Sequence, residues 1–487
     1  MVADRLRSHA RRAGGRIAVR TRSTTGWSAM TWAELRDAAL SAVANVTGPA
    51  RPRGPAIVLV DNTPASVASL LGLAMAGVDM LLMERENSYL HDERSVVNRL
   101  PATDLICPSD VQLPRAGLAQ RTFNGLIAGP PATDPPRAEH PGSAILQLTS
   151  GSTGEPKIVR QTLGNILTGG ALHRDLHRVT EADTLFAMVP LAHSFGLVGA
   201  LATALVSGAG LMTMSRFTPG AVLEGLDAGA TGLLGTPLVY ELISPVLPRR
   251  TADARARFAL SSGGPLAPRV GEAVGERLGV PVHQVYGSTE TGLLACQYDR
   301  PEPWPENCVG TMAPGVEWRV RSHEGRYALQ GRGQLLVRTT TMFLGHEGDR
   351  GSPFRDDGFF ESGDLVEVDA VGHVTVLARK DTFVNVGGRK VNPRRVERVV
   401  AEHPGVREVF VYGGTARAGE EEIHAALVLG PDAGTGDVME FCRTRLMRYE
   451  VPHHVHALPS LPRTGMGKVD LCRLLEIVAA AEKRTND

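Results

Sequence analysis

The sequence predicts an α/β protein. We expect a large N-terminal domain of parallel sheets covered by helices, together with a small antiparallel sheet or barrel, and a smaller α+β C-terminal domain. Its 487 residues exceed what one hydrophobic core usually holds, which indicates two or more domains. Apolar strand-like runs alternate with helical patterns up to about residue 286, and short strands with glycine turns follow from about residue 309.

The alternation in the first part of the chain predicts parallel sheets, because strands that alternate with helices form βαβ units. The expected strands span 55–61, 79–84, 144–148, 184–190, 209–214, 231–236, 257–262 and 281–286, and the expected helices span 63–77, 197–207, 238–247 and 269–278. From 309 to 377 the pattern is typical of an antiparallel sheet.

The last hundred residues have the pattern of a separate α+β unit. Asn392 is a good N-cap and Pro393 suits the first helical position, while Pro404-Gly405 stops the helix. Strands at 407–412 and 422–429 and a helix near 437–447 follow. We therefore divide the chain into domains 1–379 and 380–487.

Composition excludes several classes of function. Lys+Arg and Asp+Glu number 52 each, so no basic field for nucleic acid is expected. The five cysteines never have C-x-x-C spacing, which disfavours a metal centre or disulfide framework and favours a cytoplasmic location. Residues 1–20 lack the apolar core of a signal peptide, and the uncharged segment 195–215 is interrupted by small polar residues, so no membrane span is expected.

A loop of hydroxyls and glycines, closed by one cation, follows the expected strand 144–148. It contains Thr149, Ser150, Gly151, Ser152, Thr153, Gly154, Glu155, Pro156 and Lys157. Glycines let the backbone approach a ligand, and successive N–H groups form an anion nest. A flexible surface loop has the same composition, and the segment lacks the G-x-x-x-x-G-K-[ST] pattern, so the loop alone leaves phosphate binding and a plain loop both open.

Lysine is rare in this chain, since only five of the basic residues are lysines. They are Lys157, Lys380, Lys390, Lys468 and Lys483. A compact ammonium cannot be replaced by the planar guanidinium of arginine. This preference draws attention to Lys157 and Lys468.

Four further segments have unusual compositions. They are Gln284–Gly292 (QVYGSTETG), Gly358–Asp364 (GFFESGD), Arg379–Asp381 (RKD) with 387–393 (GGRKVNP), and Pro462–Asp470 (PRTGMGKVD). In this order and spacing they resemble the adenylate-forming superfamily of acyl-CoA synthetases, adenylation domains and luciferases, closest in pattern to acyl- or aryl-CoA synthetases. The resemblance covers nearly the whole chain. It implies attack of a carboxylate on the α-phosphate of ATP, release of pyrophosphate, and transfer of the acyl group to a thiol.

The resemblance implies a set of residues around ATP. The 149–157 loop would hold the β- and γ-phosphates through Thr149, Ser150, Gly151, Ser152, Thr153, Gly154 and Lys157. Glu290 would bind Mg²⁺, a hard cation that prefers carboxylate oxygens, and Thr289 would contact the α-phosphate. Adenine would lie between Tyr286 and the wall Gly263, Gly264 and Pro265, near Gln284, Gly287 and Ser288, and the ribose would meet Asp364 and Arg379.

The same resemblance assigns roles to the C-terminal domain. Lys468 would be the catalytic cation, because an ammonium between the carboxylate and the α-phosphate neutralises both. The small domain would be mobile, rotating about Asp381 between the two half-reactions. Gly387 and Gly388 would then line the tunnel for the pantetheine arm of coenzyme A, where absent side chains leave room.

The acid substrate is limited by the segment Pro190–Gly196, which resembles the H-x-x-G segment of acyl- and aryl-CoA synthetases. Amino-acid-activating domains commonly carry an Asp where this chain has Gly196, so an α-amino acid is disfavoured, since its ammonium would lack a partner. His193 would lie near the carboxylate, and the acyl pocket would include Phe195, Gly196, Leu197, Thr236, Leu238 and Ser262. We expect an apolar or aromatic carboxylic acid.

Three functions remain open at this point. The first is an acid–CoA ligase that uses ATP, Mg²⁺ and coenzyme A. The second loads the acyl group onto the phosphopantetheine of a carrier protein, which presents the same thiol arm. The third is an inactive scaffold. The chain departs from the family pattern at Gln284, Ser362, Ala378 and Arg395, and none of these changes removes a catalytic group.

Overall fold

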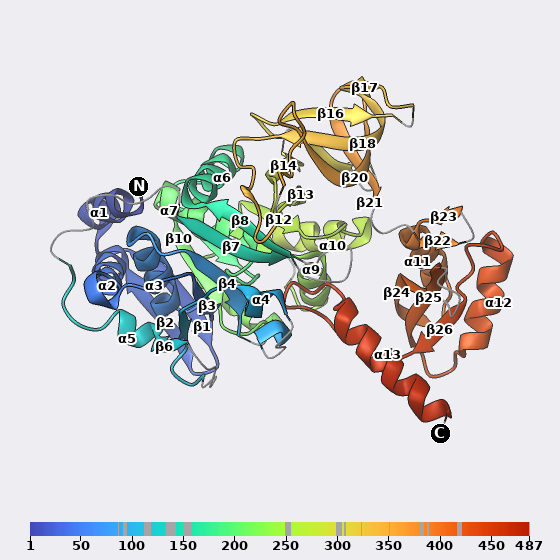
Figure 1. Ribbon diagram of the computed structural model, residues 1–487, viewed down its shortest axis with the longest axis horizontal. Helices are drawn as coiled ribbons and strands as arrows, with labels where there is room; N and C mark the ends of the chain where they lie inside the picture. Colours follow the sequence, from blue (N-terminus) through green and yellow to red (C-terminus); the bar gives the residue numbers. More distant parts are fainter. Residues whose placement is uncertain are drawn as a thin grey trace.

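The computed structural model describes residues 1–85, 87–90, 95–111, 118–132, 143–149, 157–248, 255–298, 304–305, 308–322, 324–349, 351–379, 384–386, 389–415 and 421–486. These residues form the expected α/β architecture. Two large sheets of seven and fourteen strands form the main body, and two small sheets of two and three strands follow them in the chain (Figure 1).

The seven-stranded sheet has the order β19-β8-β7-β4-β3-β5-β6. Its strands are β3 (Ala56–Val60), β4 (Met80–Glu84), β5 (Asp104–Cys107), β6 (Ala119–Thr122), β7 (Ala144–Thr149), β8 (Lys157–Thr162) and β19 (Gly345–His346). Strand β3 pairs in parallel with β4 and β5, and β4 pairs in parallel with β7. All five residues of β3 are buried, as expected for a parallel strand covered on both faces.

The fourteen-stranded sheet joins a parallel half to an antiparallel half. Its order is β17-β16-β18-β20-β21-β15-β14-β13-β12-β11-β9-β10-β1-β2. The strands are β1 (Ile17–Ser23), β2 (Gly26–Thr31), β9 (Thr184–Ala187), β10 (Gly210–Met214), β11 (Gly232–Gly235), β12 (Phe258–Ser262), β13 (Val282–Ser288), β14 (Gly292–Cys296), β15 (Cys308–Met312), β16 (Glu317–Arg321), β17 (Tyr327–Ala328), β18 (Gly331–Arg338), β20 (Phe360–Val368) and β21 (His373–Arg379). The antiparallel strands expected over 309–377 thus extend the parallel strands edge to edge.

The helices of the main body cover these sheets (Figure 1). They are α1 (Val2–Ala13), α2 (Trp32–Asn45), α3 (Pro64–Met75), α4 (Val96–Arg99), α5 (Phe123–Leu126), α6 (Leu163–Leu176), α7 (Thr203–Ser207), α8 (Pro219–Asp227), α9 (Pro237–Ile243) and α10 (Pro268–Leu278), with 3₁₀ turns η1 (Gly48–Ala50) and η2 (Ser88–Leu90). The helix expected over 197–207 begins as a π-helix, η3 (Phe195–Ala202), a rare form that is frequent at functional sites.

Local sequence explains where several of these helices begin. Thr63 accepts a hydrogen bond from the backbone N–H of Ser66, and Pro64 takes the first helical position of α3. Thr236 and Pro237 begin α9 in the same way. The expected strand 184–190 ends earlier, at Ala187, and the expected helix 238–247 ends at Ile243.

The C-terminal residues form their own small sheets. They contain β22 (Val384–Val386), β23 (Arg389–Val391), α11 (Pro393–Ala401), β24 (Val406–Thr415), β25 (Glu421–Leu429), α12 (Thr435–Arg445), β26 (His454–Ala457) and α13 (Leu471–Asn486). One face of the β24-β25-β26 sheet packs against α11 and α12, and the other packs against α13. In Figure 1, α13 extends from the C terminus toward α9 of the main body. Within the described residues, no helix combines the length and apolarity that a bilayer crossing requires.

Candidate active site

Several predicted site residues lie where parallel strands end. Strand β7 ends at Thr149, β12 ends at Ser262, and β13 ends at Ser288, directly before Thr289. Thr236 follows the end of β11. In open α/β sheets the carboxyl ends of the strands are the usual place for a ligand. The fold therefore gathers these residues at the edges where the two large sheets face each other.

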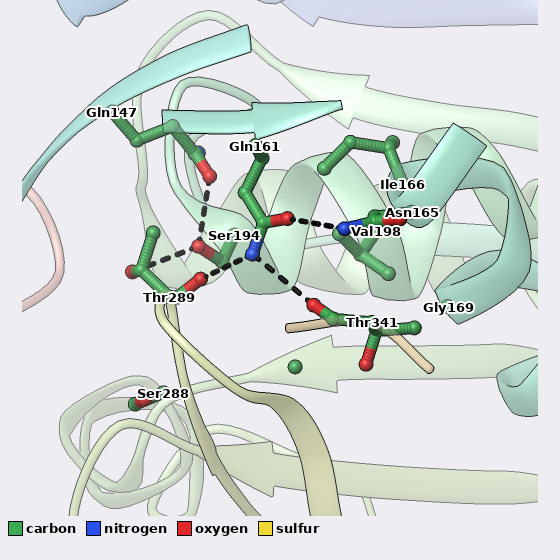
Figure 2. Close-up of a pocket in the computed structure, with 11 residues that line it drawn as sticks. Gln147, Gln161, Asn165, Ile166, Gly169, Ser194, Val198, Ser288, Thr289 and Thr341 are labelled. Carbon is green, nitrogen blue, oxygen red and sulfur yellow. Dashed lines mark hydrogen bonds between the residues drawn. The ribbon is translucent and has the colours of Figure 1, made fainter. Parts of the chain in front are cut away.

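A buried polar network fixes the loop that carries Thr289 (Figure 2). The Ser194 hydroxyl is hydrogen-bonded to Gln147 Oε1 and to Thr289 Oγ1, both at 2.9 Å. Gln161 Nε2 donates to the backbone carbonyls of Thr289 at 2.7 Å and Thr341 at 3.3 Å. Gln147 and Gln161 come from β7 and β8 of the seven-stranded sheet, so this network joins the two large sheets at Thr289.

The network surrounds a small cavity of about 20 Å³, which is the size of one water molecule. Asn165 from α6 closes the network, because its Nδ2 donates to Gln161 Oε1 at 3.3 Å and to the carbonyl of Met342 at 2.6 Å. Both the side chain and the backbone of Thr289 are therefore held before any ligand arrives.

Glu290 fits the requirements of a magnesium ligand. Its side chain is only 19% exposed and lies 3.8 Å from His346 Nε2, measured to Glu290 Oε1, while His346 Nδ1 lies 3.3 Å from Asp349 Oδ2. Burial would raise the pKa of the Glu290 carboxyl, but its interactions with His346 and Ser288 hold it below its usual value. An ionised, buried carboxylate oxygen is the ligand type that Mg²⁺ prefers.

The residues predicted to bind the nucleoside form a second group. The Tyr286 hydroxyl donates to Asp364 Oδ2 at 2.5 Å, which brings the expected adenine and ribose contacts together. The Gln284 side chain has hydrogen-bond partners within the fold. Its Oε1 accepts from the backbone N–H of Leu266 at 3.0 Å, and its Nε2 donates to the backbone carbonyl of Cys308 at 3.4 Å. Its predicted contact with the adenine amino group stays a prediction.

Glycines shape the surface around the nucleoside group. Gly263 has φ +95°, a conformation that favours glycine, and it lies in the turn after β12. Gly264 faces Pro237, and the neighbouring Pro265 is exposed. A side chain at Gly287 would overlap the backbone carbonyl of Gly292.

The segment predicted to form the acyl pocket is partly built into the core. Phe195 and Leu197 are 9% and 7% exposed and pack in the main hydrophobic core. A side chain at Gly196 would overlap the carbonyl of Pro190, so an acidic side chain has no space there. His193 Nε2 lies 2.6 Å from Oε1 of Glu84, the last residue of β4, and both side chains remain partly exposed.

Lys468 lies on a tight loop, residues 463–469, which we call the finger. Thr464 N–H donates to the Lys468 carbonyl, Gly467 N–H donates to the Thr464 carbonyl, and Arg463 Nη1 donates to the Gly467 carbonyl, all at 2.8 Å. Arg463 is also paired with Glu408 of β24. These bonds make the finger a compact projection of the C-terminal unit.

The finger contacts the main body at the carboxyl ends of the main body's parallel strands. A Cβ added to Gly263 would lie 3.8 Å from both Lys468 Cε and Met466 Cε. Met466 packs against the main core, and a Cβ on Gly467 would meet Leu238, a predicted pocket wall. The structure therefore brings Lys468 beside Gly263 although more than two hundred residues separate them.

Some predicted residues lie outside the described part of the chain. They are Ser150, Gly151, Ser152, Thr153 and Gly154 of the loop, Asp381, and Gly387 and Gly388. The residues that flank the loop are described: Thr149 and Lys157 are register partners at the ends of the β7-β8 hairpin. Arg379 is the backbone register partner of Asp364 in the β20-β21 ladder, so its position in the sheet is next to the predicted ribose contact.

Sequence reasoning missed five residues of this site: Glu84, Gln147, Gln161, Ser194 and His346. For Glu84 a signal existed, because a single carboxylate directly follows the apolar run 80–83 at the carboxyl end of an expected strand. The glutamines carry no such signal. Their role depends on a contact between two sheets, which no local pattern contains.

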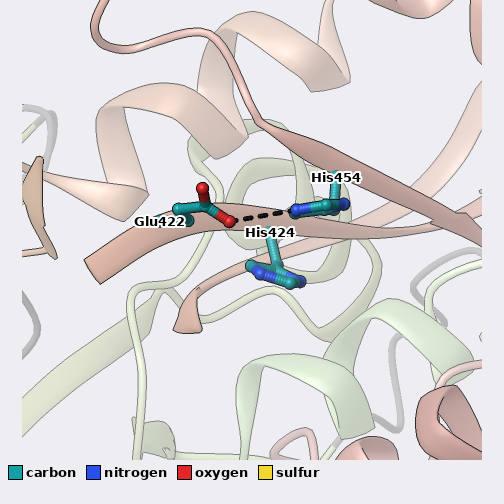
Figure 3. A group of neighbouring side chains, drawn as sticks. All are labelled: Glu422, His424 and His454. Carbon is teal, nitrogen blue, oxygen red and sulfur yellow. Dashed lines mark hydrogen bonds and ion pairs between the residues drawn. The ribbon is translucent and has the colours of Figure 1, made fainter. Parts of the chain in front are cut away.

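A second group of polar side chains lies away from this site, on β25 and β26 (Figure 3). The ligand atoms of Glu422, His424 and His454 all lie within 4.8 Å of one another. Ordinary interactions account for this arrangement: His454 Nε2 is 3.0 Å from Glu422 Oε2, and the His424 and His454 rings are 4.5 Å apart at an interplanar angle of 30°. Since these interactions explain why the three side chains lie together, we assign no metal to the group.

Relatives of the chain are predominantly ligases. The indoleacetate–CoA ligase of Aromatoleum aromaticum is 29% identical over 345 residues, which cover 69% of this chain and 67% of the relative. The 2-succinylbenzoate–CoA ligase of Bacillus velezensis is 27% identical over 434 residues, 87% of each chain.

Solved structures share the fold. ATP-bound MatB from Rhodopseudomonas palustris superposes with a TM-score of 0.82 at 24% identity, covering 98% of this chain and 99% of that one. The o-succinylbenzoate coenzyme A synthetase (MenE) of Bacillus subtilis, in complex with ATP and magnesium ion, gives 0.80 at 23% identity, covering 96% and 98%.

Family models match both parts of the chain. The model of the AMP-binding enzyme family matches residues 6–346, and the model of the AMP-binding enzyme C-terminal domain matches residues 395–468. These matches confirm the resemblance carried by the sequence motifs. The chain belongs to the AMP-binding enzyme family.

Proposed function

We propose that this protein is an AMP-forming acid–CoA ligase, which activates a carboxylic acid with ATP and then transfers the acyl group to coenzyme A. The observation that carries the proposal is the position of the finger. It lies against Gly263 and Leu238. Gly263 directly follows β12, and β12 pairs in parallel with β13, the strand that ends directly before Thr289 and Glu290. The CoA ligases among the relatives support the same reaction.

In the first half-reaction a carboxylate oxygen of the acid attacks the α-phosphorus of ATP. An O–P bond forms and the bond to pyrophosphate breaks, which leaves an acyl adenylate. We assign to Lys468 the neutralisation of the carboxylate and of the charge that develops on the α-phosphate. Thr289, held by Ser194 and Gln161, would donate to the α-phosphate in a fixed orientation.

The remaining groups would hold the nucleotide. Mg²⁺ bound at Glu290 would supply positive charge to the phosphate oxygens. Asp364 and Tyr286 would bind the ribose and adenine, and Thr149 and Lys157 would hold the pyrophosphate end of ATP from the β7-β8 hairpin. The assignment of Lys157 as an accessory phosphate contact is supported by its place at the loop end of that hairpin, opposite Thr149.

In the second half-reaction the sulfur of the thiol attacks the acyl carbonyl carbon, and AMP leaves. We propose that domain 380–487 rotates against domain 1–379 at Asp381, which withdraws the finger and brings Gly387 and Gly388 to the site. The compact hydrogen bonding within the finger supports its movement as a unit with β24.

The acid is proposed to be apolar or aromatic and to lack an α-ammonium. The absence of space for an acidic side chain at Gly196 supports this choice, because a buried ammonium needs an anionic partner. The free, buried thiols of Cys107 and Cys442 support a reducing, cytoplasmic location.

The experiment is a panel of carboxylic acids assayed for acid-dependent pyrophosphate release. Each acid is tested with coenzyme A, with a phosphopantetheinylated carrier protein, and with neither, and products are identified by mass spectrometry. An acyl-CoA product is expected. An acyl–carrier-protein product without acyl-CoA would favour the alternative acceptor, and no acid-dependent release across the panel would favour an inactive scaffold.

A further inference from the structure

Glu84 lies where the finger meets the main body. It is the last residue of β4, and four buried apolar residues precede it in the strand. Its carboxylate leaves the sheet at the carboxyl end and is 21% exposed. The hydrogen-bond distance of 2.6 Å to His193 Nε2 fixes one carboxylate oxygen, Oε1. The other oxygen, Oε2, faces the finger.

Gly465 of the finger packs directly against this carboxylate. A Cβ added to Gly465 would overlap Oε2 and Cδ of Glu84. The backbone of Gly465 is not in the left-handed region, so its conformation would accept alanine. The three atoms nearest to the added Cβ all belong to the Glu84 carboxylate, so it is the contact with Glu84, and not the turn, that favours glycine here.

Charge favours the same contact. Residues 463–469 contain no acidic residue and two basic ones, Lys468 and Arg463, of which Arg463 is paired with Glu408 of β24. Glu84 presents a carboxylate to that finger from the main body. An interaction between opposite charges at a partly exposed surface favours a defined orientation even where its contribution to affinity is small.

We propose that Glu84 is a positioning residue that seats the finger for adenylation, with Gly465 as its steric counterpart and His193 as the group that fixes its carboxylate. The inference rests on the proposed function, since it distinguishes the two half-reactions. Glu84 contacts the finger at Gly465, three residues before Lys468. Correct seating of this contact sets the position of the Lys468 ammonium relative to Gly263.

The test is a double-mutant cycle between the two residues. Gly465→Ala inserts a methyl group into a filled space, which should lower the rate of acid-dependent adenylation by about tenfold. Glu84→Ala removes the obstacle, so Gly465→Ala should cost less than about threefold in that background. Formation of thioester from synthetic acyl adenylate and coenzyme A should change by less than about twofold, because the finger is withdrawn in that step.

Gly467→Ala is the matched control. Gly467 has φ +74° and its missing side chain would meet Leu238, so this change should be equally harmful with and without Glu84. Equal cost of Gly465→Ala in both backgrounds would overturn the inference, as would equal loss in the two half-reactions. Unchanged unfolding temperatures for all variants confirm that folding is intact.

Trypsin supplies a readout that does not depend on activity, since Lys468 is a cleavage site. Gly465→Ala should raise the rate of cleavage after Lys468, and Glu84→Ala should raise it as well because the seating contact is lost. Adding Gly465→Ala to Glu84→Ala should then change the cleavage rate little further. Wild-type protein without any acid-dependent adenylation would refute the proposed function, while the cleavage rates would still decide the seating contact. Cleavage rates that are identical in all four proteins would overturn the inference.

Discussion

Replacement of Ser194 by alanine removes the hydroxyl that links Gln147 to Thr289. Both hydrogen bonds of the Ser194 hydroxyl are 2.9 Å long. Because Gln147 is only 2% exposed, its side-chain oxygen Oε1 would lose a partner in a buried position. An unsatisfied buried acceptor costs about 1–3 kcal/mol of stability. The lost orientation of the Thr289 hydroxyl, worth about 0.5–1.5 kcal/mol, should slow adenylation by about two- to tenfold.

The assay is acid-dependent exchange of pyrophosphate into ATP, together with thermal unfolding. Ser41→Ala is a matched control, because Ser41 is 3% exposed and bonds the carbonyls of Asp37 and Gly129, away from the site. Both variants should lose stability, and only Ser194→Ala should lose exchange rate. Equal exchange rates in Ser194→Ala and Ser41→Ala would refute the reasoning that Ser194 orients Thr289.

Three further variants test the nucleotide site and the fold. Glu290→Gln should need at least about tenfold more Mg²⁺ for half-maximal adenylation, and an unchanged Mg²⁺ titration would contradict the assignment. Tyr286→Phe removes the bond to Asp364 and should raise the KM for ATP about two- to tenfold with little change in kcat; a change in kcat alone would exclude this role. Asp183→Asn should cost about 1.5–3 kcal/mol of unfolding free energy at pH 7 by chemical denaturation, since Asp183 accepts from Arg257 at 2.7 and 2.8 Å. An equal cost at pH 3 and pH 7 would contradict the ion pair.

The pH dependence at Asp183 has a definite sign. Burial would raise the pKa of its carboxyl, but the Arg257 guanidinium, Thr180 and Thr231 hold it below the usual value. A carboxyl with a lowered pKa in the folded state stabilises the protein above its unfolded pKa, about 3.9, and loses that contribution as the pH falls through the folded pKa. The difference between wild type and Asp183→Asn should therefore shrink below about pH 4.

Local patterns predicted the parallel part of the fold well. Unbroken apolar runs such as 56–60 are typical of buried strands at that length, and the Thr-Pro pair at 63–64 marks a helix start. The same patterns did not predict that β14 and β15 would join the parallel strands edge to edge. That pairing depends on register between distant segments, such as Ala295 with Met312, which periodicity does not specify.

Residues that stand in motifs could be proposed for the site from the sequence, whereas residues that reach the site through a distant contact could not. Thr289, Glu290, Asp364 and Lys468 stand in motifs and could be named from the sequence. Glu84 follows an apolar run in the sequence, but its contact with Gly465, nearly four hundred residues later, is visible only in the structure. Gln284 shows the reverse case, because its side chain has partners within the fold that the motif did not suggest.

The most direct test of the account measures the two half-reactions of Lys468→Ala separately. Removing one preorganised cation from the site should lower the rate of adenylation by about 10²–10³-fold. Thioester formation from synthetic acyl adenylate and coenzyme A should stay within about threefold of the wild-type rate, since the proposed rotation of the C-terminal domain would carry the finger away. Equal loss in both half-reactions, or unimpaired adenylation, would contradict the claim that the finger delivers the catalytic cation.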